Sequence, residues 1–130
     1  VYNDSYVVHE PNTQWENLDT ANTQRYNFEE YSAAAMLRGN LPHNNPMWHR
    51  RVHEKYGTFD DKYRSGADWD FWLRCAFGGS TFMKHPEVLG VYYFNPTGVS
   101  TNTEWEEQKR EEEKDIFQKY LQVYQENLNK

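Results

Sequence analysis

The stretch SGADWDFWLRCAFGG, residues 65–79, constrains the fold more than any other part of this sequence. It is bounded by glycines, and large apolar side chains recur inside it at the spacing of one helix face. The pair Gly78 and Gly79 is typical of a helix C-terminus. We therefore expect a helix that begins near Asp68, packs an apolar face on the core, and ends at the glycine pair.

The two carboxylates of this stretch are expected to face in different directions. At about 100° per residue, Asp68 projects on the same side as Phe71 and Trp72. Asp70 falls beside Arg74 on roughly the opposite side, four residues away. An exposed pair at that spacing contributes only a few tenths of a kcal/mol. The pattern therefore predicts that Asp70 and Arg74 form a surface pair, while Asp68 faces inward.

A carboxylate on an apolar face, as expected for Asp68, is costly unless it is hydrogen-bonded, paired or placed on a cleft. Asp68 could cap its helix by accepting from the free N–H groups of the first turn. It could instead be a general base, partly desolvated and flanked by aromatic rings. Asp68-Trp69-Asp70 also matches the D-x-D motif of many metal-dependent glycosyltransferases. A helix separates the two carboxylates by about 200°, so we expect no metal site here.

The rest of the chain alternates strand-like and helix-like patterns separated by Pro, Gly and Asn. The expected elements are strands at 1–9 and 88–94, a shorter strand before the HPE triplet, helices at 28–38, 49–56 and from 103 onward, and loops at 12–27, 58–66 and 95–102. There is no internal repeat and no sign of a second domain. The chain is therefore expected to be one α/β domain or domain fragment over residues 1–130, with a few strands and three to four helices.

The tail at 103–130 predicts an amphipathic helix. Its apolar stripe consists of Ile116, Phe117, Tyr120, Leu121, Tyr124 and Leu128. The run EEQKREEEKD at 106–115 precedes the stripe and is typical of a solvated helix face.

Composition excludes several function classes. A net charge of −6 argues against binding nucleic acid through its phosphates, since the only basic cluster is HRRVHEK at 49–55. His49 and His53 have the spacing of a two-histidine metal site but lack the acidic partner.

A single cysteine, Cys75, excludes an intrachain disulfide and suits a reducing compartment. No run is long and apolar enough to cross a bilayer. With 10 Tyr, 7 Phe and 5 Trp, the chain has enough aromatic side chains to build a core and to stack on flat ligands.

Three motifs follow one another in the middle of the chain. They are GTFDD at 57–61, DWDFWLR at 68–74 and LGVY at 89–92. In this order, within residues 44–100, they resemble the acceptor-side half of family 2 glycosyltransferases, which have the GT-A (nucleotide-diphospho-sugar transferase-like) fold. The opening VYNDSYVV is similar to the strand that follows the metal-binding motif in these enzymes. The resemblance covers about half of the chain.

The resemblance implies an inverting transfer of a sugar from a nucleotide-sugar donor to an acceptor hydroxyl, as in bacterial polysaccharide biosynthesis. Asp68 takes the place of the catalytic aspartate, the general base that removes the acceptor proton. Trp48 and Trp69 are expected to border the acceptor, and Asp61 is carried over as a substrate-binding residue. The loop NPTGVS at 95–100 resembles the segment that closes near the donor.

The sequence departs from the family pattern in two places. Ala67 stands before Asp68, where many members have Glu. The N-terminal nucleotide-binding half, with the D-x-D that holds a divalent cation (Mg or Mn), lies outside this segment. We therefore expect a partial GT-A fold that is inactive alone, binds no metal itself and exposes a face to the missing half. The resemblance implies a cytoplasmic protein, and peripheral attachment to the inner face of the plasma membrane stays open.

A second function fits the same residues. The aromatic side chains and the acidic surface also suit a carbohydrate- or protein-binding module without chemistry. The two functions differ at Asp68, because replacing this residue with Asn removes turnover only if it is a base. If Asp68 merely caps its helix, the same change leaves activity intact, since Asn caps nearly as well as Asp.

Overall fold

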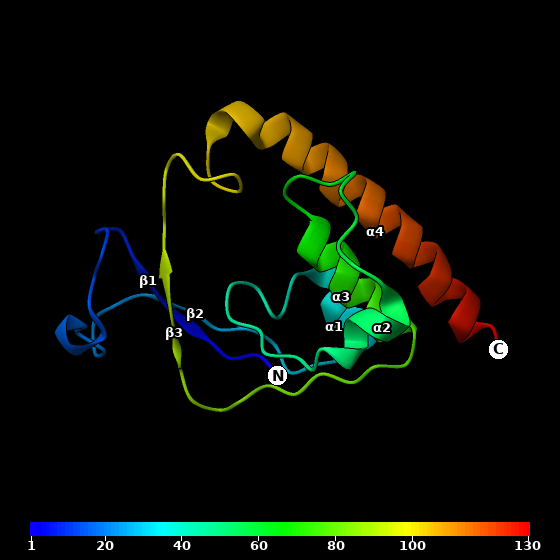
Figure 1. Ribbon diagram of the computed structural model, residues 1–130, viewed down its shortest axis with the longest axis horizontal. Helices are drawn as coiled ribbons and strands as arrows, with labels where there is room; N and C mark the ends of the chain where they lie inside the picture. Colours follow the sequence, from blue (N-terminus) through cyan, green and yellow to red (C-terminus); the bar gives the residue numbers. More distant parts are fainter.

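The computed structural model describes all residues 1–130, and it has a mixed α and β architecture. A small sheet lies on one side and the helices on the other, with the longest helix crossing the top of the helical layer (Figure 1). The elements are β1 (Ser5–Val8), β2 (Arg25–Tyr26), α1 (Ala33–Arg38), α2 (Arg51–Tyr56), α3 (Ala67–Phe77), β3 (Gly90–Tyr93) and α4 (Glu106–Leu128), with short 3₁₀ turns at Trp15–Asn17 and Thr103–Trp105. The expected α/β class is confirmed at this level.

The sheet has the order β2-β1-β3. β1 pairs with β2 in the antiparallel sense, Ser5 opposite Tyr26, and with β3 in the parallel sense, Ser5 opposite Gly90. A parallel pair requires a long crossover, and here the crossover contains α1, α2 and α3. The fold therefore brings β3 back beside β1 only after the chain has passed through the three helices.

A loop packs directly onto the sheet at Gly90. A Cβ atom at Gly90 would lie 2.2 Å from Nδ2 of Asn45 and 2.5 Å from Oγ of Ser5. Asn45 in turn donates to Oδ1 of Asn3 at 2.5 Å, and Ser5 Oγ donates to Oδ1 of Asn44 at 3.0 Å. The absence of a side chain at Gly90 thus allows the loop through residues 43–45 to approach the sheet closely.

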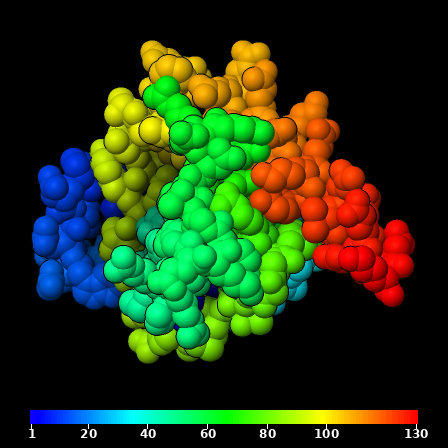
Figure 2. Space-filling model, turned by 45° about the vertical axis from the view of Figure 1, so that its right-hand side comes forward, coloured from blue at the N-terminus to red at the C-terminus, as the bar shows by residue number.

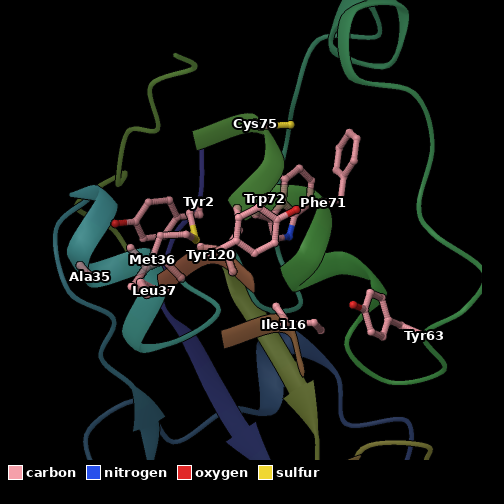
Figure 3. Packing of buried hydrophobic residues seen from close by; sticks show 12 residues of the cluster. Tyr2, Ala35, Met36, Leu37, Tyr63, Phe71, Trp72, Cys75, Ile116 and Tyr120 are labelled. Carbon is pink, nitrogen blue, oxygen red and sulfur yellow. The ribbon is translucent and has the colours of Figure 1, made fainter. Parts of the chain in front are cut away.

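The hydrophobic core surrounds α3. Phe71 and Leu73 are fully buried, and they share one cluster with Met36 of α1 and Ile116 of α4 (Figure 3). Tyr2, which lies before β1, closes the cluster from the sheet side and is also fully buried. The stretch SGADWDFWLRCAFGG therefore forms the central helix of the molecule, and its predicted packing on the core is confirmed.

Several expected boundaries shift in the structure. The strand predicted at 1–9 narrows to Ser5–Val8, with an isolated bridge from Tyr2 to Lys84. The helix predicted from residue 28 begins only at Ala33, because Ser32 Oγ accepts from the N–H of Ala35 at 2.9 Å and caps it. The predicted loop at 12–27 contains the two-residue strand β2, which the polar composition concealed.

The prediction that Asp70 lies on the surface is wrong. Its side chain has no solvent exposure and forms ion pairs with Arg74 at 2.7 Å and Lys119 at 2.6 Å. The hydroxyl of Tyr120 also donates to Asp70 Oδ1 at 3.1 Å. A helical wheel drawn for α3 alone does not reveal the burial of Asp70. Helix α4 supplies Lys119 and Tyr120 and covers the side of α3 that we expected to face water.

The charged run before the apolar stripe also differs from the prediction at one residue. Glu112 is buried, whereas a solvated face was expected there. The stripe itself is buried only in part, since Ile116 and Tyr120 are covered but Leu128 is 68% exposed. Figure 2 shows the reason, because the C-terminal end of α4 projects beyond the rest of the molecule.

Candidate functional site

An open cleft of about 460 Å³ lies where β3, the first turn of α3 and the start of α4 meet. Its lining consists of Arg38, Gly39, Asn40, His43, Asn44, Ser65, Gly66, Asp68, Trp69, Tyr92, Ser100, Lys109 and Glu113. Most of these side chains are polar. Proteins with parallel strands often bind ligands beyond the carboxyl ends of those strands, and the position of this cleft agrees with that tendency. We call this cavity the Asp68 cleft.

Asp68 is half-buried in the first turn of α3, and two donors fix its carboxylate. Oδ2 accepts from Nδ2 of Asn40 at 2.7 Å, and Oδ1 accepts from the backbone N–H of Trp69 at 2.9 Å. A carboxylate has about four acceptor positions, so both oxygens keep lone pairs free for a ligand. The carboxylate is therefore held in place without being fully occupied.

The N-terminus of α3 is capped by Glu112 of α4. Oε1 of Glu112 accepts from the N–H of Ser65 at 2.8 Å and of Gly66 at 3.0 Å, and the N-cap residue Gly66 has no side chain to do so. Asp68 takes one N–H group of the first turn, that of Trp69. Glu112 and Asp68 thus share the capping of α3.

Asn40 links Asp68 to a strained neighbour, His43. While its amide nitrogen donates to Asp68, its Oδ1 accepts from the backbone N–H of His43 at 3.0 Å. His43 has a φ of 46°, in the left-handed region that non-glycine residues rarely adopt. Such strain is often found where the surrounding structure holds a residue for function.

Three aromatic rings hold the imidazole of His43. The ring centroids of Tyr26 and Tyr92 each lie 4.9 Å from the His43 centroid, and that of Phe28 lies 5.4 Å away. These residues come from β2, β3 and the segment after β2, so the sheet itself orients the histidine. Burial raises the pKa of the Tyr92 hydroxyl, which therefore stays protonated and able to donate at neutral pH.

Hydrogen bonding fixes the tautomer of His43. Its Nδ1 lies 3.0 Å from Oδ1 of Asn44. The Asn44 amide is oriented by donating from Nδ2 to the carbonyl of Val91 at 3.3 Å, which leaves Oδ1 toward the imidazole. Nδ1 must therefore carry a proton, and in the neutral ring Nε2 is an acceptor. His43 lines the cleft, and none of its hydrogen bonds within the protein involves Nε2.

The charges of the Asp68 cleft are balanced. Arg38 and Lys109 contribute two cations, and Asp68 and Glu113 contribute two carboxylates. Lys109 lies 3.9 Å from Glu113 and donates to the carbonyl of Ser100 at 3.1 Å. A balanced lining of donors, acceptors and the rings of Trp69 and Tyr92 suits an uncharged ligand with many hydroxyl groups more than a strong anion.

The structure brings together only two of the four predicted site residues. Trp69 lines the cleft with Asp68, and its Nε1 donates to the carbonyl of Met36 at 2.8 Å. Trp48 lines a different cleft, between α2 and α3, and Asp61 lies in a third hollow beside Arg74. The loop predicted at 95–100 reaches the Asp68 cleft through Ser100.

Sequence reasoning missed Asn40, His43 and Glu112. Asn40 and His43 lie in the segment NLPHNNP, residues 40–46, whose two prolines indicated only an extended chain or a turn. Asparagine and histidine in a turn before a second proline could have signalled a local hydrogen-bonded loop. Nothing in the sequence distinguishes Glu112 from its acidic neighbours, because its role depends on which face of α4 meets α3.

Comparisons with protein-family models, with curated proteins and with solved structures found no match for this chain. None of its helices combines the length and the hydropathy that a bilayer crossing requires. No group of three His, Cys, Asp or Glu side chains is arranged to hold a metal ion.

Proposed function

We propose that this chain is the acceptor-side part of an inverting glycosyltransferase, with Asp68 as the general base. The observation that carries the proposal is the Asp68 carboxylate, oriented by Asn40 and by the N–H of Trp69 at the edge of a polar cleft. The order of the GTFDD, DWDFWLR and LGVY motifs supports it. The proposal includes a partial GT-A fold for this chain.

In this proposal each residue of the cleft has a defined task. The acceptor hydroxyl donates to a free lone pair of Asp68, which takes its proton as the oxygen attacks the anomeric carbon. His43 Nε2 accepts a second hydroxyl of the same sugar, and the Tyr92 hydroxyl donates to a third oxygen. Trp69 supplies apolar surface for a sugar face. Asn40 positions the base through its hydrogen bond at 2.7 Å.

The diphosphate of the donor is not expected to bind in this cleft, whose charges balance. The resemblance assigns it to the nucleotide-binding half, where a D-x-D outside these residues would hold Mg or Mn. Asp68 and Asp70 do not fit that task, because Asp70 is fully buried between Arg74 and Lys119 while Asp68 faces Asn40. We therefore expect the 130-residue chain to bind an acceptor sugar but not to transfer one.

The experiment is a titration of the ¹⁵N-labelled chain with neutral mono- and oligosaccharides, followed by amide shifts. Shifts are expected at Asp68, Trp69, His43 and Tyr92. His43→Gln, which keeps a donor but loses the ring acceptor, is expected to weaken binding about tenfold. The matched control is His49→Gln, which lies outside this cleft. Shifts that cluster elsewhere, or none with any neutral sugar, would contradict the proposal.

A carbohydrate-binding module without chemistry is the second candidate, favoured by the rings of Trp69 and Tyr92 in the same cleft. It predicts the same shifts, so binding alone does not separate the two. They separate at Asp68→Asn in a polypeptide that joins this chain to a nucleotide-sugar-binding half. A transferase loses turnover after this change, whereas a pure binding module has no turnover to lose.

A further inference from the structure

A second cleft, of about 790 Å³, lies between α2, the middle of α3 and residues 79–82. It shares no lining residue with the Asp68 cleft. More than half of its lining is hydrophobic, and its aromatic members are Trp48, Tyr56, Trp72 and Phe82. The function proposed above makes no use of this cavity, which we call the Trp48 cleft.

Trp48 is exposed and yet rigidly held. Its side chain is 41% exposed, while its Nε1 donates to Nε2 of His53 at 3.0 Å. His53 Nδ1 is bonded to the carbonyl of Gly57 at 2.8 Å, and the imidazole stacks on Phe71 at 4.8 Å. The Trp48 ring also meets the Trp72 ring edge-on at 4.9 Å. A large ring held in this way forms a preorganised wall, because little side-chain entropy remains to be lost on binding.

Beside this wall lie cations that form no ion pair, although Lys55 Nζ lies 5.0 Å from the centroid of the Tyr56 ring. Arg51 and Lys55 line the cleft, and Arg50 is their exposed neighbour in sequence. None of the ion pairs of the chain involves any of these three residues. The lining has one carboxylate, that of Glu54. In a chain of net charge −6, this is a local excess of positive charge next to an apolar cavity.

Two further features characterise the lining of the Trp48 cleft. Met47, on the lining, is 76% exposed, so the cleft has an apolar lip as well as an apolar interior. Trp72, also on the lining, has the only buried side-chain polar atom of the chain without a hydrogen-bond partner, its Nε1. An unsatisfied buried donor is unfavourable by about 1–3 kcal/mol.

We propose that the Trp48 cleft binds a single-chain amphiphile with an anionic head group, such as an alkyl phosphate. The apolar tail lies between the rings of Trp48 and Phe82 and along Met47, and the head group lies at Arg51 and Lys55. An apolar ligand without charge would leave the two cations unused. A free anion such as inorganic phosphate would leave the hydrophobic walls in water. The proposal is independent of the transferase function, because the two clefts are separate.

The test is isothermal titration of the chain with decyl phosphate below its micelle concentration. Decyltrimethylammonium reverses the charge of the head group, and inorganic phosphate removes the tail. We expect one saturable site for decyl phosphate, at least tenfold weaker binding of decyltrimethylammonium, and no measurable binding of phosphate. Vesicles of phosphatidylglycerol and phosphatidylcholine form a separate arm, in which binding by vesicles but not by decyl phosphate would replace the cleft ligand with a membrane surface and overturn the proposal.

Variants locate the site. Arg51→Gln and Lys55→Gln are each expected to weaken decyl phosphate binding about fivefold, the size expected when one cation near an anionic head group is lost. The matched control is Lys114→Gln, which removes the same charge from an exposed position of α4. Trp48→Ala should weaken decyl phosphate and decyltrimethylammonium alike, and Leu128→Ala, on the projecting end of α4, should weaken neither. Equal affinity for the two amphiphiles, or unchanged affinity in the cation and Trp48 variants, would contradict the proposal.

Discussion

Asp70 shows how the environment of a single residue decides its role. The residue lies in the same helix turn as Asp68, yet its carboxylate is buried against two cations and the Tyr120 hydroxyl. Desolvation, then the charge and hydrogen bond of Asp70, raise the pKa of Tyr120, so this phenol stays a donor at every ordinary pH. Two acidic residues only two positions apart thus have different surroundings, since Asp70 is enclosed by its partners and Asp68 lines the Asp68 cleft.

Replacing Asp70 with Asn should destabilise the protein. The change removes the charge that holds Arg74 and Lys119, although both cations can still reach water. The expected loss is about 2–3 kcal/mol in the free energy of unfolding, below that of a fully enclosed pair. Urea unfolding measures it. Asp61→Asn, at an exposed position, is the control and should stay within about 0.5 kcal/mol of the parent protein.

Glu112 predicts a dependence of stability on pH. Burial alone would raise its pKa, but hydrogen bonds from the backbone N–H groups of Gly66 and Ser65 outweigh burial and hold it below the ordinary value of 4.5. A depressed pKa stabilises the folded state fully above the unfolded value, and that stabilisation is lost as the pH falls through the folded value. Stability should therefore fall below pH 4.5.

Glu112→Gln tests this directly. It should lower the free energy of unfolding by about 1–2 kcal/mol at pH 7, the size of a lost helix cap, and by less as the pH falls below 4. Thermal unfolding at a series of pH values measures both effects. Glu111→Gln, the exposed neighbour, is the control. Equal losses for the two variants at pH 7 would show that Glu112 does not cap α3.

At the scale of elements, the Asp68 cleft depends on how one loop sits on the sheet. The segment with Asn40, His43 and Asn44 lies against β1 and β3, and Gly90 allows this approach. α4 completes the other side of the cleft through Lys109 and Glu113. The cleft is therefore made by contacts between elements that are distant in sequence.

Gly90→Ala should disturb this packing. The added Cβ would meet the Asn45 and Ser5 side chains at distances that real Cβ atoms essentially never show, so these side chains must move and give up their hydrogen bonds to Asn3 and Asn44. We expect a loss of about 1–3 kcal/mol in stability, together with amide shift changes at His43. Gly39→Ala is the control, because a Cβ there meets nothing within 4 Å and its backbone is extended, with φ of −177°. Equal stability of the two variants would contradict the close approach at Gly90.

At the scale of the whole molecule, the packing of the core can be tested by the reactivity of its single thiol, that of Cys75. Burial raises the pKa of Cys75 from 9.0 to about 11. The thiolate fraction at pH 8 is then about 100-fold lower than in the unfolded chain, and the side chain is also shielded from reagents. Ellman's reagent should therefore react with the native protein at least 100-fold more slowly than with the protein in urea. Comparable rates would mean that the side of α3 at Cys75 is not packed as described.

The sequence predicted the parts of this molecule that depend on local pattern. The central helix with its glycine end, the strand before Pro11 and the amphipathic tail all follow from periodicity and turn residues. Prediction from the sequence failed for residues whose burial depends on partners from other elements. Asp70 and Glu112 looked exposed on their own helices, and they are buried because α3 and α4 cover each other. His43 could not be found, since its role depends on rings from three segments.

The most direct test of the central claim is turnover by Asp68→Asn in a polypeptide that joins this chain to a nucleotide-sugar-binding half. Transfer of a labelled sugar to an acceptor hydroxyl is measured beside donor binding and thermal stability, with Glu111→Gln as the control. Loss of a general base should lower kcat by about 10²–10⁴-fold, with donor affinity and unfolding temperature nearly unchanged. Transfer near the parent rate by a folded Asp68→Asn protein would show that Asp68 is not the base.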